Sequence, residues 1–269
     1  MTTLPPAAVT PTRADQKRVR ELHAKKGRRE QNAFLVEGGK SVAELLASDW
    51  PVLAAYATPE YLAGPAAADL RTAAARRGLR LTEVGASLLT SLGTFEHNDS
   101  AIAVAGARRW SLQAPQAGAL TLALDDIRDP GNLGTILRLA DWYGVTQVVC
   151  SPGTAEWQNP KVIAASMGSF LRVGVHERPL ADWLAGLRAD GVAIAGAVLD
   201  GENTHALATP FTDGVLVIGN ESHGLSAEVQ AQLTRRLTIP CFGVAESLNA
   251  AIATGILLDG WRRTHNRRD

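Results

Sequence analysis

The chain has 269 residues, of which 46% are hydrophobic and 20% charged, and its 27 basic residues balance 27 acidic ones. These ordinary globular values exclude a disordered or fibrous chain. No apolar run reaches the roughly 18 residues of a membrane-spanning helix, and the first residues lack the apolar core of a secretory signal. Two cysteines cannot form a disulfide framework, and no CxxC pair offers a zinc site. We therefore expect a cytoplasmic protein.

Basic residues gather in three clusters although the whole chain is neutral. Each cluster alone is typical of a solvated helix face. Three together favour a polyanionic partner such as nucleic acid. The clusters are Arg13, Lys17, Arg18, Arg20, Lys25, Lys26, Arg28 and Arg29; then Arg71, Arg76, Arg77 and Arg80; and finally Arg262, Arg263, Arg267 and Arg268.

The first part of the chain predicts a flexible tail over 1–12 and then an α/β domain over 13–105. Residues 106–118 lack periodicity and carry a proline and two glycines, so we interpret them as a linker. Within the domain the pattern predicts, in order, a helix at 15–26, a strand and turn at 34–38, a helix at 41–47, a strand at 52–56, a helix at 66–77, and strands at 79–84 and 101–105.

From residue 119 to 269 predicted strands alternate with predicted helices, which indicates a mostly parallel sheet covered on both faces. Ligands of such sheets bind at the carboxyl ends of the strands. The predicted strands are 120–124, 146–150, 172–176, 192–198, 215–218 and 237–239. The predicted helices are 135–143, 160–167, 180–189, 227–233 and 249–262.

The first of three unusual segments is 129–135, Asp-Pro-Gly-Asn-Leu-Gly-Thr, which we interpret as a loop between a strand and a helix. Its glycines permit close backbone approach, and a helix start offers free N–H groups. Arg138 then falls within the first helical turn. A plain turn with Asn132 as turn residue and Thr135 as cap explains the segment equally well. The pattern is neither a GxGxxG fingerprint nor a Walker A loop.

The second segment is 219–226, Gly-Asn-Glu-Ser-His-Gly-Leu-Ser, directly after an apolar strand. Glu221 either faces a ligand or orders the loop by accepting backbone N–H groups, and the two roles can coexist. His223 is more simply an exposed loop histidine than a general base, because the sequence offers it no evident catalytic partner.

The third segment is 239–249, Ile-Pro-Cys-Phe-Gly-Val-Ala-Glu-Ser-Leu-Asn, which opens the last helix. Ser247 or Asn249 can serve as its N-cap. The helix that follows is rich in small residues, which allow close packing against another element such as a partner subunit. These residues are Ala250, Ala251, Ala253, Thr254 and Gly255.

In this order and spacing, the segments resemble the SPOUT superfamily, specifically its TrmH-like (SpoU) RNA ribose 2′-O-methyltransferases. DPGNLGTILRLAD is similar to the first family motif, VIGNESHGLS to the second and IPCFGVAESLNAAIATGILL to the third, over about 120–262. Residues 25–46, KKGRREQNAFLVEGGKSVAELL, are similar to the family's substrate-binding module, an α/β sandwich seen in some ribosomal proteins. The stretch EHNDSAIAV at 96–104 departs from relatives, many of which have a Pro-Gln-Gly-containing stretch there.

The resemblance implies a fold, a cofactor and an assembly. It implies that the C-terminal sheet carries a deep trefoil knot, which general topology rules disfavour. It implies that the knot loops bind S-adenosylmethionine, with Gly219, Ile239 and Leu248 in contact by position. It also implies a homodimer with the active site near the interface. No metal is required, and no histidine or cysteine cluster offers a site for one.

The same resemblance places Asn132, Arg138, Glu221, Ser247 and Asn249 at catalytic positions. Methylation of a ribose needs help in removing the 2′-hydroxyl proton, and Arg138 is the candidate for that help. Arginine almost never loses its own proton in proteins, so Arg138 either acts beside an RNA phosphate or clamps that phosphate. The two asparagines and Ser247 hold the ribose, the phosphate or Arg138, and Glu221 orients Arg138 or the loop.

The basic first domain then predicts RNA phosphate contacts from Lys25, Lys26, Arg28 and Arg29. By family analogy, an appended domain of this type fits ribosomal RNA better than tRNA. The sequence therefore predicts an S-adenosylmethionine-dependent RNA 2′-O-ribose methyltransferase.

Three alternatives stay open: a non-catalytic RNA-binding or ribosome assembly factor on the same fold, a base methyltransferase of the knotted class, and an ordinary nucleotide-binding α/β enzyme. The intact set of five catalytic residues argues against the first. The Ser-Leu-Asn motif favours ribose over base, and the missing phosphate-loop motifs argue against the third. We expect Cys150 and Cys241 to be buried thiols without a chemical role.

Overall fold

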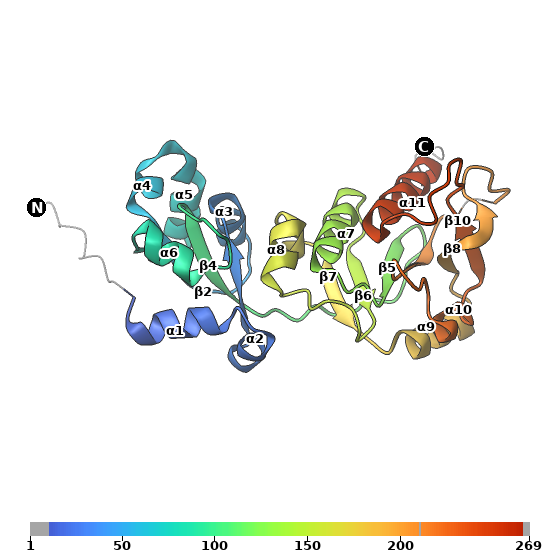
Figure 1. Cartoon of the computed structure of the whole chain (residues 1–269), viewed down its shortest axis with the longest axis horizontal. Helices are drawn as coiled ribbons and strands as arrows, with labels where there is room; N and C mark the ends of the chain where they lie inside the picture. Colours follow the sequence, from blue (N-terminus) through green and yellow to red (C-terminus); the bar gives the residue numbers. More distant parts are fainter. Residues whose placement is uncertain (1–10, 210, 266–269) are drawn as a thin grey trace, which may run out of the picture. The chain divides into compact units, whose positions relative to one another are not determined.

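The computed structural model describes residues 11–209 and 211–265. Contacts between Cα atoms divide the chain into two compact units (Figure 1). The first unit runs to Arg109 and also includes Gln158–Ala164. The second unit holds Trp110–Trp157 and the residues from Ala165 onward.

Two sequence predictions concern residues outside the described ranges. The tail predicted over 1–12 is described only at its last two residues, and Thr12 is the N-cap of the first helix. Arg267 and Arg268 of the third basic cluster also lie outside the described residues.

The first unit is built on a four-stranded sheet in the order β1-β4-β2-β3. β4 runs antiparallel to both of its neighbours, and β3 pairs parallel with β2. The elements of this unit up to Gly106 are α1 (Arg13–Glu21), α2 (Lys25–Gln31), β1 (Ala33–Glu37), α3 (Gly39–Ala47), β2 (Val52–Ala57), α4 (Pro59–Ala63), a 3₁₀ turn (Pro65–Ala67), α5 (Ala68–Arg77), β3 (Thr82–Glu83), α6 (Ala86–Leu92) and β4 (Ala101–Gly106).

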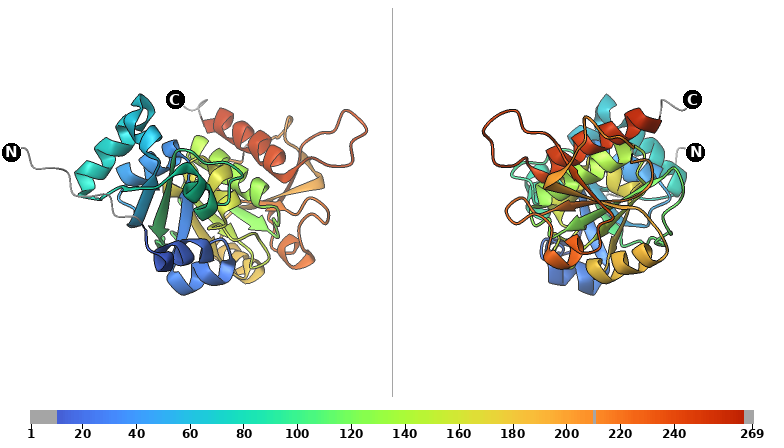
Figure 2. Two further views of the ribbon diagram at one scale, coloured as in Figure 1. Left: turned by 60° about the vertical axis from the view of Figure 1, so that its left-hand side comes forward. Right: turned by 90° about the vertical axis from the view of Figure 1, so that its right-hand side faces the viewer.

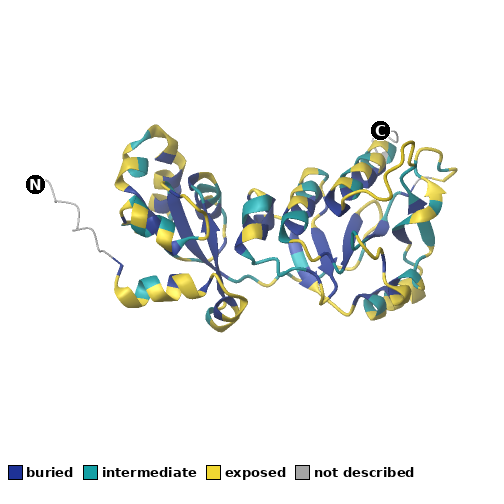
Figure 3. Cartoon of the chain, in the orientation of Figure 1, coloured by how far each residue is buried: buried dark blue, intermediate teal, exposed yellow. Residues whose placement is uncertain are grey.

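Apolar side chains cover both faces of this sheet because neighbouring strand residues point to opposite sides. Val19 of α1 and Leu89 of α6 belong to one buried cluster with Leu35 of β1. The adjacent Phe34 meets Trp50 edge to face, with ring centroids 6.2 Å apart. Figure 3 shows the buried residues concentrated along the strands of each unit.

The single helix predicted over 15–26 is interrupted. α1 ends at Glu21 and α2 begins at Lys25. The Nη1 group of buried Arg28 donates to the backbone carbonyls of Leu22 at 2.9 Å and of His23 at 2.8 Å. Arg28 therefore supplies hydrogen-bond donors to the backbone carbonyls at the break between the two helices. This differs from the expected phosphate contact, because the guanidinium is directed into the fold and not to solvent.

We predict that Arg28→Ala lowers the free energy of unfolding by about 2–3 kcal/mol. The substitution removes two hydrogen bonds from a charged donor and leaves two carbonyls without it. Arg29→Ala is the matched control, since Arg29 is exposed and should change stability by less than about 0.5 kcal/mol. Urea unfolding followed by circular dichroism measures both, and equal stability of the two variants would contradict this role of Arg28.

The sheet of the second unit has six strands in the order β10-β8-β9-β5-β6-β7. Every pairing in it is parallel. The elements from Leu120 onward are β5 (Leu120–Asp125), α7 (Pro130–Trp142), β6 (Gln147–Cys150), α8 (Pro160–Ser166), a 3₁₀ turn (Ser169–Leu171), β7 (Gly174–Glu177), α9 (Leu180–Ala189), β8 (Ile194–Asn203), β9 (Gly214–Gly219), α10 (Ala227–Gln230), β10 (Arg235–Thr238) and α11 (Ala250–His265). Of these, α8 falls mostly within the segment Gln158–Ala164 of the first unit.

Helices cover both faces of this parallel sheet, as the alternating pattern predicts. α7 and α11 pack together on one face, and α9 and α10 lie on the opposite face (Figures 1 and 2). The central strand β5 is buried over its whole length. The predicted α/β class with a parallel C-terminal sheet is confirmed, and the trefoil knot stays a prediction. Within the described ranges, no helix is long and apolar enough to cross a membrane.

Candidate active site

A cavity of about 860 Å³ lies where β9 and β10 end. Small-molecule sites typically have volumes of about 300–1,000 Å³. The three residues expected to contact the cofactor, Gly219, Ile239 and Leu248, all line this cavity. The fold therefore brings the second and third unusual segments together at the carboxyl end of the sheet, where ligands of parallel sheets bind.

Gly219 is a glycine for a steric reason. A Cβ atom at this position would overlap the backbone of Gly224. The loop folds back here because Asn220 and Gly224 exchange two backbone hydrogen bonds, of 3.0 and 2.9 Å. Gly224 itself has a φ of 68°, which favours glycine. The wall of the cavity at this point is thus formed by closely packed backbone.

The first unusual segment is helical, which corrects its interpretation as a loop. α7 begins at Pro130, and the carboxylate of Asp129 caps it by accepting from the N–H of Asn132 at 2.8 Å. Thr135 is therefore not the cap. Counted from Pro130, Arg138 is the ninth residue of α7, well beyond the first turn where the sequence analysis placed it.

Three of the predicted catalytic residues form a continuous chain of hydrogen bonds. The side-chain amide of Asn132 donates to the carboxylate of Glu221. The side-chain oxygen of Asn132 accepts from the amide of Asn249 at 2.9 Å. Asn249 is also the N-cap of α11, because its oxygen accepts from the N–H of Ala251 at 3.0 Å. One chain of bonds thus links α7, the loop after β9 and the start of α11.

The remaining two catalytic candidates lie differently. Ser247 is exposed and lines the cavity together with Glu221. Arg138 is exposed and does not line the cavity, and within the described residues it has no hydrogen bond or ion pair. It lies about 9 Å along α7 from Asn132 and about 120° around the axis. Within the described part of one chain, Arg138 therefore makes no bond to Glu221.

Comparison with protein families identifies the family of this chain. Residues 119–259, more than half of the chain, match the family model described as the SpoU rRNA Methylase family. The chain belongs to this family. Residues 15–103 match a second model, described as the MRM3-like substrate binding domain. The SpoU resemblance seen in the three motifs is thereby confirmed.

Individual SpoU relatives match along nearly the whole chain. The 23S rRNA (guanosine(2553)-2′-O)-methyltransferase RlmP of Bacillus subtilis is 30% identical over 239 residues, covering 89% of this chain and 92% of RlmP. A solved TrmH-family structure from Porphyromonas gingivalis superimposes with a TM-score of 0.82 and 36% identity, covering 95% of this chain and 100% of that one. An AdoMet-bound rRNA methyltransferase from Sinorhizobium meliloti gives 0.82, with 29% identity and coverage of 95% and 97%.

The two cysteines of this SpoU chain differ from one another. Cys150 is buried, and burial raises the pKa of its thiol to about 12, with a further contribution from nearby Glu177. The thiol is therefore protonated at neutral pH. Cys241 is exposed and lines the cavity, which corrects the expectation that it is buried. Among the described residues, no three His, Cys, Asp or Glu side chains gather as metal ligands.

Two substitutions of Asn249 separate the effect of its N-cap bond from the effect of its bond to Asn132. We predict that Asn249→Ala lowers the free energy of unfolding by about 1 kcal/mol, because α11 loses its N-cap. Asn249→Asp keeps the capping oxygen and most of the stability, but it cannot donate to Asn132, so methyl transfer should fall in both variants. Urea unfolding and methyl transfer assays measure the two effects. Full activity of Asn249→Asp would show that the bond to Asn132 is dispensable.

Proposed function

We propose that this SpoU-family chain transfers a methyl group from S-adenosylmethionine to a ribose 2′-hydroxyl of ribosomal RNA in the cytoplasm. The observation that carries the proposal is the bonded set of Asn132, Glu221 and Asn249 beside the 860 Å³ cavity. A protein that only bound RNA would have no need of both a ligand-sized cavity and a network of hydrogen-bonded polar side chains beside it.

The cavity fits the cofactor in size and in the character of its walls. Ile239 and Leu248 supply apolar surface, and Gly219 contributes closely packed backbone to the wall without a side chain. These three residues would hold S-adenosylmethionine. When bound, the cofactor supplies an activated methyl group, so the protein needs to provide position and proton removal.

Four polar residues prepare the ribose. Asn132, Ser247 and Asn249 offer amide and hydroxyl groups that hydrogen-bond to a ribose or to its phosphate. Glu221 fixes the amide of Asn132 by accepting a hydrogen bond from it. The guanidinium of Arg138 is exposed to solvent, where it can clamp an RNA phosphate with two parallel bonds.

The proposal includes an RNA-binding surface on the first unit, formed by the exposed side chains of Lys25, Lys26 and Arg29. We predict that reversing these three charges to glutamate weakens RNA binding and lowers the magnitude of the log–log salt slope by about 2. Filter binding over a salt series measures this, with Arg109→Glu as a control at an exposed arginine outside the three basic clusters. An unchanged affinity would move the RNA surface elsewhere.

The proposal also includes a homodimer through α7 and α11. Ile252 and Ile256 lie one helical turn apart and are 57% and 39% exposed, so both present apolar surface on the same side of α11. They line a hollow of about 1,150 Å³ together with Leu139 and with Asn132 of the catalytic set. A second copy would cover this apolar surface next to the site. Sedimentation equilibrium tests it: a particle of 28.5 kDa instead of twice that mass would refute the dimer.

The direct test is methyl transfer from radiolabelled S-adenosylmethionine to unmodified ribosomal RNA and, in parallel, to tRNA. We expect label in ribosomal RNA, with the modified nucleotide resistant to alkaline cleavage because its 2′-hydroxyl is blocked. Label only in tRNA would change the substrate class, and label released as a methylated base would exclude ribose chemistry. Cofactor binding without transfer to either RNA would point to a non-catalytic RNA-binding protein.

A further inference from the structure

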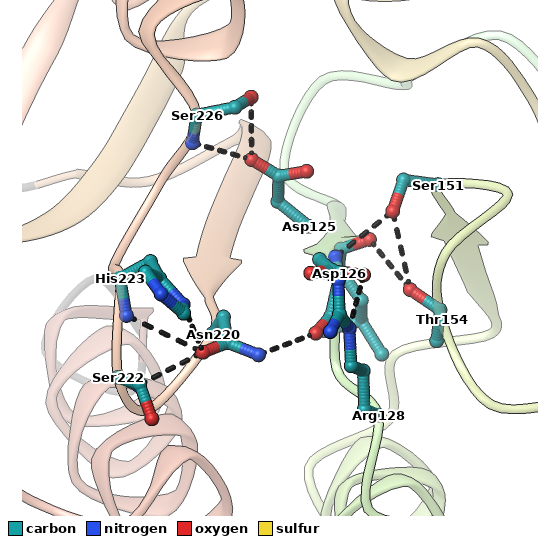
Figure 4. Close-up of polar contacts among 10 residues, drawn as sticks. Asp125, Asp126, Arg128, Ser151, Thr154, Asn220, Ser222, His223 and Ser226 are labelled. Carbon is teal, nitrogen blue, oxygen red and sulfur yellow. Dashed lines mark hydrogen bonds and ion pairs between the residues drawn. The ribbon is translucent and has the colours of Figure 1, made fainter.

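Two consecutive residues at the end of β5 hold both ends of the loop 219–226 (Figure 4). The carboxylate of buried Asp125 accepts from the N–H and the hydroxyl of Ser226, at 2.7 and 2.8 Å. The side-chain amide of Asn220 donates to the carbonyl of Asp126 at 2.8 Å. The loop is therefore fastened to the centre of the sheet at its first polar residue and again at its last.

The carbonyl that receives Asn220 is itself held in place. Asp126 has a φ of 60°, an uncommon conformation for a residue with a side chain. Its N–H donates to the hydroxyl of Ser151 at 2.8 Å, and its carboxylate pairs with Arg128 at 2.9 Å. Backbone in such a conformation persists when its surroundings fix it, and these outliers gather at functional sites.

Asn220 uses the other end of its amide to shape the loop tip. Its oxygen accepts from the N–H of Ser222 at 2.8 Å and from that of His223 at 3.3 Å. Glu221 lies between these anchored positions, and its carboxylate accepts from Asn132. One amide thus fixes the residues on both sides of Glu221 relative to the end of β5.

We propose that Asn220 is a positioning residue of this enzyme, which holds the Glu221 carboxylate where it orients Asn132 for the ribose. The proposal rests on the proposed methyl transfer. Sequence reasoning missed Asn220 because its side chain bonds mainly to backbone groups, one of them 94 residues away. Its oxygen also lies 3.4 Å from Nδ1 of the neighbouring His223. The neighbouring Asp125–Ser226 bonds keep the loop attached when Asn220 is changed, so the effect of Asn220 on Glu221 can be measured in a folded protein.

The test is Asn220→Asp, which keeps the size of the side chain and the oxygen facing Ser222. It replaces the amide donor by an oxygen that faces the carbonyl of Asp126. We expect kcat for methyl transfer to fall about 10- to 100-fold, as small misplacements of catalytic groups do, with KM for RNA changed less than about threefold. The thermal midpoint of unfolding is measured for every variant alongside the kinetics.

Asn98→Asp is the matched control. Asn98 is buried in the first unit and makes the same two kinds of bond, donating to the carbonyl of Ala101 at 3.2 Å and accepting from the N–H of Ser100 at 3.1 Å. We expect this variant to lose stability while keeping the kcat of the wild type. An equal fall of kcat in both variants would reduce the role of Asn220 to general stability and overturn the proposal.

A double-mutant comparison separates positioning of Glu221 from an independent effect. If Asn220 acts through Glu221, Asn220→Asp should lower kcat less than about threefold further in a Glu221→Gln background. If the falls in kcat of the two single variants instead multiply in the double variant, the proposal is overturned.

A measurement that does not depend on methyl transfer keeps this inference separate from the proposed function. In ¹⁵N-resolved NMR spectra, the side-chain amide signal of Asn132 should shift in Asn220→Asp in the same direction as in Glu221→Gln. An unshifted signal would overturn the positioning role. Absence of methyl transfer by the wild type would refute the proposed function alone.

Discussion

We expect replacement of Arg138 with alanine to lower kcat for methyl transfer by about 10²- to 10⁴-fold, the usual range for loss of a group that assists proton removal or stabilises charge. The guanidinium is exposed and has no bond to the described residues, so its removal leaves no group unsatisfied in the fold. The thermal midpoint and the affinity for S-adenosylmethionine should therefore stay at wild-type values. Single-turnover assays with saturating RNA measure the loss.

Two further variants give this result its meaning. Arg138→Lys keeps the charge but not the planar fork, so activity well below that of the wild type would indicate two-point recognition of a phosphate. Arg188→Ala removes another exposed arginine, from α9 on the opposite face of the sheet, and should leave kcat unchanged although it loses a bond to the backbone of Ala231. Near-normal turnover of Arg138→Ala would remove Arg138 from the catalytic set.

Elements with strong local signals were predictable from the sequence. The helix at 180–189 matches α9 residue for residue, and the apolar run at 120–124 matches β5 except for its last residue, Asp125. Both have a clear periodicity or an uninterrupted apolar run, which dominates when nothing in the tertiary structure opposes it.

Elements decided by distant contacts were not predictable. The helix predicted over 15–26 breaks because Arg28 reaches back to the carbonyls before it. α6 (Ala86–Leu92) was missed, and its Leu89 and Leu92 owe their burial to packing with Val19 of α1. The early start of α7 did carry a local signal, since Asp before Pro is a usual N-cap and first-turn pair.

The site could be predicted as a set of residue types but not as a network. Family resemblance supplied Asn132, Glu221 and Asn249, and the parallel sheet explains why their segments meet. The bonds join positions 89 and 117 residues apart, so no local pattern encodes which amide faces which carboxylate. Arg138 shows the reverse case: its position in the motif placed it with the others, while the helix directs it away from them.

The second prediction with a large expected effect concerns cofactor binding in the cavity. Gly219→Ala places a methyl group against the backbone of Gly224, so the end of β9 or the loop after it has to move. Overpacking of this kind costs about 1–3 kcal/mol. Because the displaced backbone is a wall of the cavity, most of that cost should appear as weaker cofactor binding, by about 5- to 150-fold. Isothermal titration with S-adenosylmethionine measures the dissociation constant directly.

Gly186→Ala is the matched control for this experiment. Gly186 lies within α9 of the same unit, and a Cβ atom there meets nothing within 4 Å. The same chemical change should leave cofactor affinity unaltered and stabilise the protein by up to about 1 kcal/mol, because alanine favours the helix. Wild-type cofactor affinity in Gly219→Ala would mean that the loop adapts without reshaping the cavity. In that case the glycine would serve chain packing, and the cofactor site would have to rest on Ile239 and Leu248.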